Sequence, residues 1–178
     1  MALGLFGGRK PDHPLADDKS AKEALAALPK NEPEKALQEI HDWIVSVAAV
    51  EDFKPERRAE IYLLLDETAL PFHRKLTRDY VATPNITKTQ EARLWKLLSS
   101  YWTDLSLAYS VIAAFCAADS GVSGKLKSQL PLVCLRGLRA EAGRLKWQYF
   151  HYEPDSAEAW KAICSIYHLA IQRKFCAD

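Results

Sequence analysis

Three basic side chains in the last third of the chain have the spacing of one helix face. Arg136, Arg139 and Lys146, with Gly143 between them, follow steps of three and four residues, and Trp147 comes directly after them. Guanidinium and ammonium groups beside an indole ring bind phosphates, carboxylates or a stacked base. This basic face (Arg136, Arg139 and Lys146), together with Trp147, is therefore the candidate ligand-binding site, and a small anionic effector such as a nucleotide fits its chemistry.

The charge distribution offers a second interpretation of the basic face. Six bases and one acid lie between Lys125 and Lys146, whereas eight acids and four lysines lie between Asp12 and Asp42. The basic face would then be a solvated surface that pairs with acidic helices of the same chain. Its few cations are also a short footprint for duplex DNA, and a net charge of +1 gives no general attraction to nucleic acid. We therefore do not expect nucleic acid as a partner.

Catalytic and metal-binding patterns are missing from the sequence. No two of the five histidines have the i, i+4 spacing of a helical metal site, and HExxH does not occur. Cys164 and His168 are four residues apart and could form a thiol–imidazole pair, but Cys164 lies on an apolar helix face, where packing explains it better. Gly121-x-x-Gly124-Lys125 lacks the strand and the preceding glycine of a phosphate-binding loop, which indicates a turn. We predict a non-catalytic protein without a metal or cofactor.

The scaffold that must position these residues is organised around residues 91–118. An apolar seam with helical spacing runs through this stretch, and it consists of Trp95, Leu98, Trp102, Leu105, Tyr109, Ile112 and Cys116. A second apolar line lies beside it, made of Leu94, Leu97, Tyr101, Ala108, Val111 and Phe115. The 14 residues between Asp104 and Asp119 carry no charge, which is too short a run to span a bilayer. We expect a central helix covered by other helices.

Prolines, glycines and capping residues divide the rest of the chain into further helices. Pro71 lies inside one apolar seam, so we expect a kink or break near Ala69. Thr87 or Thr89 is expected to cap the central helix. The other predicted helices span 18–28, about 31–50 with Asn31 as N-cap, 55–82, 127–149, and 155 or 156 to about 175.

These elements predict an all-α fold without strands. Residues 1–14 are expected to be a flexible leader, because Gly7, Gly8, Pro11 and Pro14 oppose regular structure. Residues 15–178 would form a single domain, an antiparallel helical bundle or stacked helical hairpins of about six helices. The last predicted helix is still apolar close to the end of the chain, so we expect the domain to be the N-terminal part of a longer protein.

One short pattern occurs twice, 65 residues apart, in Trp95-x-x-Leu98-Ser99-x-x-Trp102 and Trp160-x-x-Ile163-Cys164-x-x-Tyr167. It resembles the first helix of a tetratricopeptide repeat, in which a leucine, a small residue and a tyrosine follow a tryptophan-like position. The resemblance covers two helices, and the period is 65 residues instead of about 34. It implies stacked antiparallel helical hairpins and no particular ligand.

Three functions are compatible with these observations. The first is a non-catalytic interaction or regulatory domain of a cytoplasmic signalling protein, which presents a groove to a protein partner or to a second domain of the same chain. The second is binding of a small anionic effector on the basic face. The third is homodimerisation through an uncovered apolar helix face. The four cysteines have no disulfide or metal spacing, which favours reduced thiols in the cytoplasm, and we expect no membrane segment.

Overall fold

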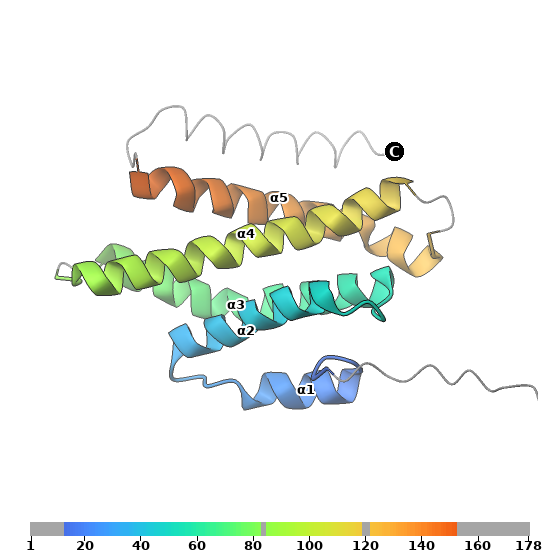
Figure 1. The fold of residues 1–178 in the computed structure, drawn as a ribbon, viewed down its shortest axis with the longest axis horizontal. Coiled ribbons are helices and arrows are strands. Elements are labelled where there is room, and N and C mark those ends of the chain that lie inside the picture. Colours follow the sequence, from blue (N-terminus) through green and yellow to red (C-terminus); the bar gives the residue numbers. More distant parts are fainter. Residues whose placement is uncertain (1–12, 83–84, 119–121, 153–178) are drawn as a thin grey trace, which may run out of the picture.

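The computed structural model describes residues 13–82, 85–118 and 122–152, and within these ranges it contains five α-helices and no strand. The all-α prediction is confirmed. The predicted sixth helix, from residue 155 or 156 to about 175, lies outside the described residues, as do the first 12 residues of the predicted leader. The helices are α1 (Asp18–Ala27), α2 (Pro33–Ala49), α3 (Pro55–Ala82), α4 (Lys88–Ala118) and α5 (Gly124–Tyr152) (Figure 1).

Side-chain caps determine where three of these helices begin. The Asp17 carboxylate accepts a hydrogen bond from the Ser20 amide at the start of α1 (2.9 Å). At the start of α4, the Thr87 hydroxyl accepts from the Gln90 amide (3.3 Å), and the Gln90 side chain accepts from the Thr87 amide (3.2 Å). This is a capping box, so the prediction of Thr87 as a cap is confirmed. The Ser123 hydroxyl caps α5 by accepting from the Leu126 amide (3.2 Å).

The start of α2 differs from the expectation. The N-cap residue is Glu32, not Asn31, and its side chain makes no capping hydrogen bond. Pro33 is instead the first helical residue, where its fixed φ favours the helix and its missing N–H costs nothing.

Two prolines lie inside helices without ending them. A kink or a break was expected near Ala69, and α3 continues through Pro71, so the helix is not broken there. Pro131 lies within α5, because this helix begins at Gly124 and not near residue 127. Both prolines are exposed, so the carbonyls that lose an amide partner can bond water instead.

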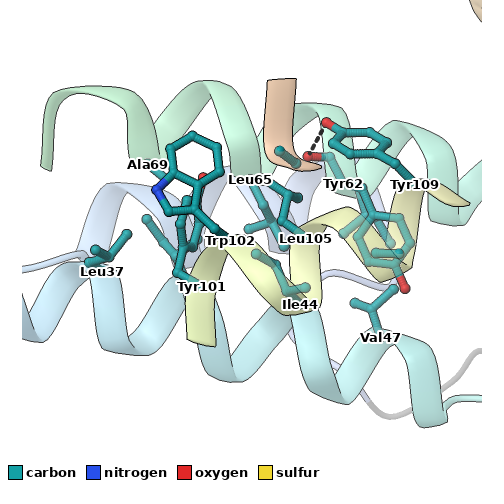
Figure 2. Close-up of a cluster of buried hydrophobic side chains, with 14 of the residues drawn as sticks. Leu37, Ile44, Val47, Tyr62, Leu65, Ala69, Tyr101, Trp102, Leu105 and Tyr109 are labelled. Carbon is teal, nitrogen blue, oxygen red and sulfur yellow. Dashed lines mark hydrogen bonds between the residues drawn. The ribbon is translucent and has the colours of Figure 1, made fainter. Parts of the chain in front are cut away.

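α4, the predicted central helix, contacts α2, α3 and α5, and α3 likewise contacts three helices. α2 also contacts α3, and α3 contacts α5. Figure 1 shows α2 and α4 running in one direction and α3 and α5 in the other. Apolar side chains from α2, α3 and α4 fill the space between the helices, including Leu37, Ile44, Val47, Leu65 and Leu105 (Figure 2).

The predicted seam of α4 is largely confirmed. Its buried members are Leu98, Trp102, Leu105, Tyr109 and Ile112, whereas Trp95 and Cys116 are half-buried. The second apolar line is only partly covered, because Val111 is 51% exposed. The neighbouring residue Leu107 is 61% exposed. One side of the central helix therefore faces solvent, contrary to the expectation that other helices cover it.

Several apolar residues of α5 lie outside the core. Leu135 is 46% exposed, and Leu138 and Leu145 are half-buried. The buried residues of α5 that belong to the core recur every seven positions instead, namely Leu126, Val133, Ala140 and Trp147. Two glycines allow α5 to approach α4 closely along this line. A Cβ on Gly137 would lie 3.0 Å from the Tyr109 Cβ, and a Cβ on Gly143 would lie 2.5 Å from the Trp102 ring.

We predict that Gly143→Ala lowers the free energy of unfolding by about 1–3 kcal/mol, because the added methyl group would overlap the buried Trp102 ring. Gly124→Ala is the matched control, since nothing lies within 4 Å of a Cβ at that position. Denaturant melts of both variants measure the difference. In a Trp102→Ala background the alanine at 143 should no longer destabilise, and an equal loss in both backgrounds would contradict this assignment.

Candidate functional site

Two residues of the predicted basic face bind a buried carboxylate within the chain. The guanidinium of Arg139 donates to Oδ1 of Asp66, and Nη1 of Arg136 lies 3.6 Å from Oδ2 of the same residue. The Asp66 side chain is fully buried on α3, whereas the two arginine side chains are each about one quarter exposed. Arg136 and Arg139 therefore lie on one side of α5, as predicted, but the anion that they both bind is the Asp66 carboxylate of α3.

Two tyrosines of α4 complete the coordination of Asp66. The Tyr101 hydroxyl donates to Oδ1 (3.3 Å) and the Tyr109 hydroxyl lies 3.2 Å from Oδ2. The Tyr109 hydroxyl is also 3.2 Å from the Tyr62 carbonyl oxygen. We call these five residues the Asp66 network: Asp66, Tyr101, Tyr109, Arg136 and Arg139. It joins α3, α4 and α5 through one carboxylate.

Burial controls the protonation of this network. Removal from water raises the pKa of Asp66, and the positive charges of Arg139 and Arg136 act against that rise. Burial, with the adjacent carboxylate, also raises the pKa of Tyr101 and Tyr109 well above the ordinary value. Both phenols therefore remain protonated donors at neutral pH, which suits a structural role and not proton transfer.

A buried histidine lies against the same cluster. The His73 ring packs edge-on against Trp102, with centroids 5.0 Å apart, and the Arg139 guanidinium lies 5.8 Å from the Trp102 ring centroid. Burial, together with the nearby positive charge of Arg139, lowers the pKa of His73 to about 4. Its Nε2 is buried and has no hydrogen-bond partner among the residues that the structure describes. His73 is therefore a neutral ring at pH 7, and no spacing in the sequence pointed to it.

The other two predicted site residues, Lys146 and Trp147, differ in how exposed they are. Lys146 is exposed. Trp147 is only 4% exposed, packs edge-on against Tyr80 with centroids 5.2 Å apart, and accepts a hydrogen bond on its carbonyl from the Trp95 indole (3.1 Å). Its ring is part of the core, so it offers no free face on which a ligand could stack.

The basic region does pair within the chain, but with partners other than the acidic amino-terminal segment. Lys125 pairs with Glu60 on α3, and Arg144 pairs with Glu141 on its own helix (2.5 Å). The amino-terminal acids have other partners, since Glu34 binds Arg93 on α4 (2.5 and 2.8 Å). Four of the six basic residues between Lys125 and Lys146 therefore pair with acids of α3 or α5, and the pairing expected with the amino-terminal acids is not what these four make.

A groove between α2 and α4 contains cations that the sequence did not bring together. It has a volume of about 750 Å³, and it is lined by Glu32, Pro33, Glu34, Lys35, Gln38, His41, Leu76, Arg93, Lys96, Leu97 and Ser100. Lys35 pairs with Glu32 and Arg93 with Glu34, whereas within the described ranges Lys96 has no ion-pair partner. We call this the α2/α4 groove.

His41 closes one side of the α2/α4 groove. Its Nε2 lies 2.7 Å from a carboxylate oxygen of Asp104, which fixes the position of α2 along α4. Its Nδ1 is buried, and no residue in the described ranges is its hydrogen-bond partner. No linear motif could have revealed this site, because its basic residues come from α2 and α4, and the contacts that bring the helices together span 59 and 63 positions.

Metal and membrane functions find no support in this part of the chain. Among the described residues, no group of three or more His, Cys, Asp or Glu side chains is placed to hold a metal ion. None of the helices in the described ranges has a stretch both long and apolar enough to cross a membrane.

The fold and these sites define a helical domain with one internally neutralised polar network and one mixed-charge groove. A family model described as the cyclic-di-GMP receptor FimW, N-terminal domain, matches residues 19–178, and the chain therefore belongs to that family. Comparison with curated proteins and with solved structures gave no significant match.

We predict that Asp66→Ala lowers the free energy of unfolding by about 3 kcal/mol, because it leaves two guanidiniums and two buried hydroxyls without their common acceptor. Asp42→Ala is the control, since that side chain is 65% exposed and its loss should cost less than about 0.5 kcal/mol. Urea melts at neutral pH compare the two. Equal stability of both variants would show that the network contributes nothing.

His73 should make stability depend on pH in a defined window. The unfolded imidazole takes up a proton near its ordinary pKa of 6.5, whereas the folded one resists protonation down to about 4. Stability is therefore lost as the pH falls from about 6.5 to 4, and this residue accounts for about 2 kcal/mol of the loss by pH 5. In His73→Phe the difference in unfolding free energy between pH 7 and pH 5 should shrink by that amount. An unchanged difference would show that the ring is not held neutral.

Proposed function

We propose that this chain is a non-catalytic, helical regulatory domain of a cytoplasmic cyclic-di-GMP signalling protein. The observation that carries the proposal is the family match over residues 19–178, because the family is described as the N-terminal domain of a cyclic-di-GMP receptor. The Asp66 network supports the non-catalytic part of the proposal, because its buried polar groups are committed to one another. Such a network stabilises a scaffold and leaves no poised acid, base or nucleophile among its members.

A second candidate function is direct binding of the nucleotide in the α2/α4 groove. Cyclic di-GMP has two phosphates and two guanines, so a site for it needs cations and groups that pair with base edges. Lys96 and Arg93 can meet phosphate or the guanine O6 and N7 atoms, and Glu34 can accept from the guanine N–H groups. A volume of about 750 Å³ is within the usual range of ligand pockets.

The groove fits a nucleotide better than the predicted basic face does. Arg136 and Arg139 already bind Asp66, and Trp147 is buried, so only Lys146 of the predicted set is freely accessible. A ligand on that face would have to compete with a buried carboxylate for both guanidiniums. In the groove, the side chains of Lys35 (71% exposed) and Arg93 (64% exposed) pair with Glu32 and Glu34, which are themselves 54% and 32% exposed, so a ligand there would not compete with a fully buried carboxylate.

Calorimetry with cyclic di-GMP separates these possibilities. If the nucleotide binds in the groove, the double change Arg93→Ala and Lys96→Ala should weaken binding at least about tenfold, because two phosphate donors are lost. Lys146→Ala on the basic face is the matched control and should bind like the wild type. Weaker binding by Lys146→Ala, with the double variant like the wild type, would instead favour the basic face. Absence of binding heat with the wild type would show that this domain does not bind the nucleotide.

Chromatography of cyclic di-GMP after incubation with the chain tests the non-catalytic assignment. We expect the nucleotide to stay intact, because the family is described as a receptor domain and no metal-ligand cluster lies among the described residues. Appearance of the linear dinucleotide would contradict the proposal.

A further inference from the structure

Beyond the groove, the seam between α2 and α4 becomes apolar and open to solvent. Val45 on α2 is 48% exposed, and on α4 Leu107 and Val111 are 61% and 51% exposed. Ala48 and Ala114 are exposed beside them. We call these residues, Val45, Ala48, Leu107, Val111 and Ala114, the uncharged patch.

The contact between His41 and Asp104 shows that the two halves of the patch lie along one seam. α2 and α4 run in the same direction from that contact (Figure 1). Val45 follows His41 by one helical turn, and Leu107 and Val111 follow Asp104 by one and two turns. The side of each helix that faces the other near the contact thus carries the patch residues further along.

The patch is free of charge and has exposed carboxylates at both ends. Residues 43–49 of α2 and 105–118 of α4 contain no ionisable acid or base apart from Tyr109 and Cys116. At one end lie the carboxylates of Asp42 and Asp104, whose side chains are 65% and 36% exposed. At the other end lie Glu51 and Asp52, both exposed, and the guanidinium of Arg58 reaches this end, where it donates to the Val50 carbonyl (2.7 Å). The exposed carboxylates are complementary to an apolar segment that has basic residues beside it.

We propose that the uncharged patch is a docking surface for an amphipathic helix of a partner protein, in which lysines or arginines border the apolar stripe. Three large aliphatic side chains exposed together are costly to leave in water, and the small residues Ala48 and Ala114 allow a helix to approach closely. The basic residues of the partner would meet Asp42 and Asp104 on one side and Glu51 and Asp52 on the other.

The carboxylates at the two ends also argue against two other occupants of the uncharged patch. In a symmetric pair of chains packed through the patch, the acidic ends would face acidic ends, which opposes self-association. An anionic lipid surface would be repelled for the same reason. A partner with basic flanks is the occupant whose charge the surface matches.

A synthetic amphipathic peptide of about five helical turns tests the proposal. Its apolar stripe consists of leucine and alanine bordered by lysine, and a second peptide carries glutamate in place of lysine. Fluorescence anisotropy with the full chain, without nucleotide, should show binding of the lysine peptide that weakens with added salt, and at least about tenfold weaker binding of the glutamate peptide.

Variants of the chain locate the binding. Leu107→Lys and Asp42→Lys should each weaken the lysine peptide at least about tenfold, the first by placing a charge in the patch and the second by reversing its border. Leu64→Lys is the control, because Leu64 is 38% exposed on α3 outside the patch. Circular dichroism shows whether each variant is folded. Leu107, Asp42 and Leu64 are all exposed, so each variant should remain folded.

Several results would overturn the proposal. Equal binding of both peptides would show that charge complementarity does not contribute to the interaction. An equal loss of peptide binding in Leu64→Lys would show that the peptide does not bind at the uncharged patch. A wild-type chain that is dimeric by light scattering, and monomeric after Leu107→Lys, would assign the patch to a second copy. Because no nucleotide is present, failure here leaves the proposed role in cyclic-di-GMP signalling untouched, and failure of that role leaves the patch untouched.

Discussion

The fold depends on a carboxylate that is buried among helices. An ionised aspartate inside a protein costs several kcal/mol unless nearby groups replace the lost water. Asp66 has four such groups, two guanidiniums from α5 and two hydroxyls from α4. These donors come from fixed positions on two helices, so satisfying the carboxylate also fixes how far each helix is shifted along α3. The same arrangement consumes the arginines that would otherwise be free for a ligand.

Periodicity and capping residues were enough to predict most of the fold, because the apolar stripes of α2, α3 and α4 are what their burial requires. Thr87 marks the start of α4 because a threonine at that position can accept from a free amide of the first turn. Spacing could not show what a helix face meets. Arg136 and Arg139 were correctly placed on one side of a helix, but whether that side met water, ligand or Asp66 depended on the neighbouring helix. The available signal was Asp66 itself, an acid that directly follows the apolar run that ends at Leu65.

The candidate site was predicted less well than the fold for a related reason. The α2/α4 groove and the uncharged patch are built from residues that gain meaning only when two helices lie side by side. Lys96 on its own is an ordinary surface lysine, and Leu107 an ordinary member of an apolar helix. The exposed side of α4 was misjudged because a long uncharged run indicates burial by something, without saying whether the cover belongs to the same chain. The family description names a cyclic-di-GMP receptor, and the proposed ligand rests on that description.

The parallel arrangement of α2 and α4 has a consequence for how the chain reaches its folded state. The pairs that join them, Glu34 with Arg93 and His41 with Asp104, are 59 and 63 residues apart in sequence. Closing such a loop is entropically costly and is repaid only once α3 has returned along α2. The surface shared by α2 and α4 should thus form late, after the local helical hairpins. During synthesis, a chain that has not yet reached α4 would present neither the groove nor the patch, so neither can engage a ligand or partner prematurely.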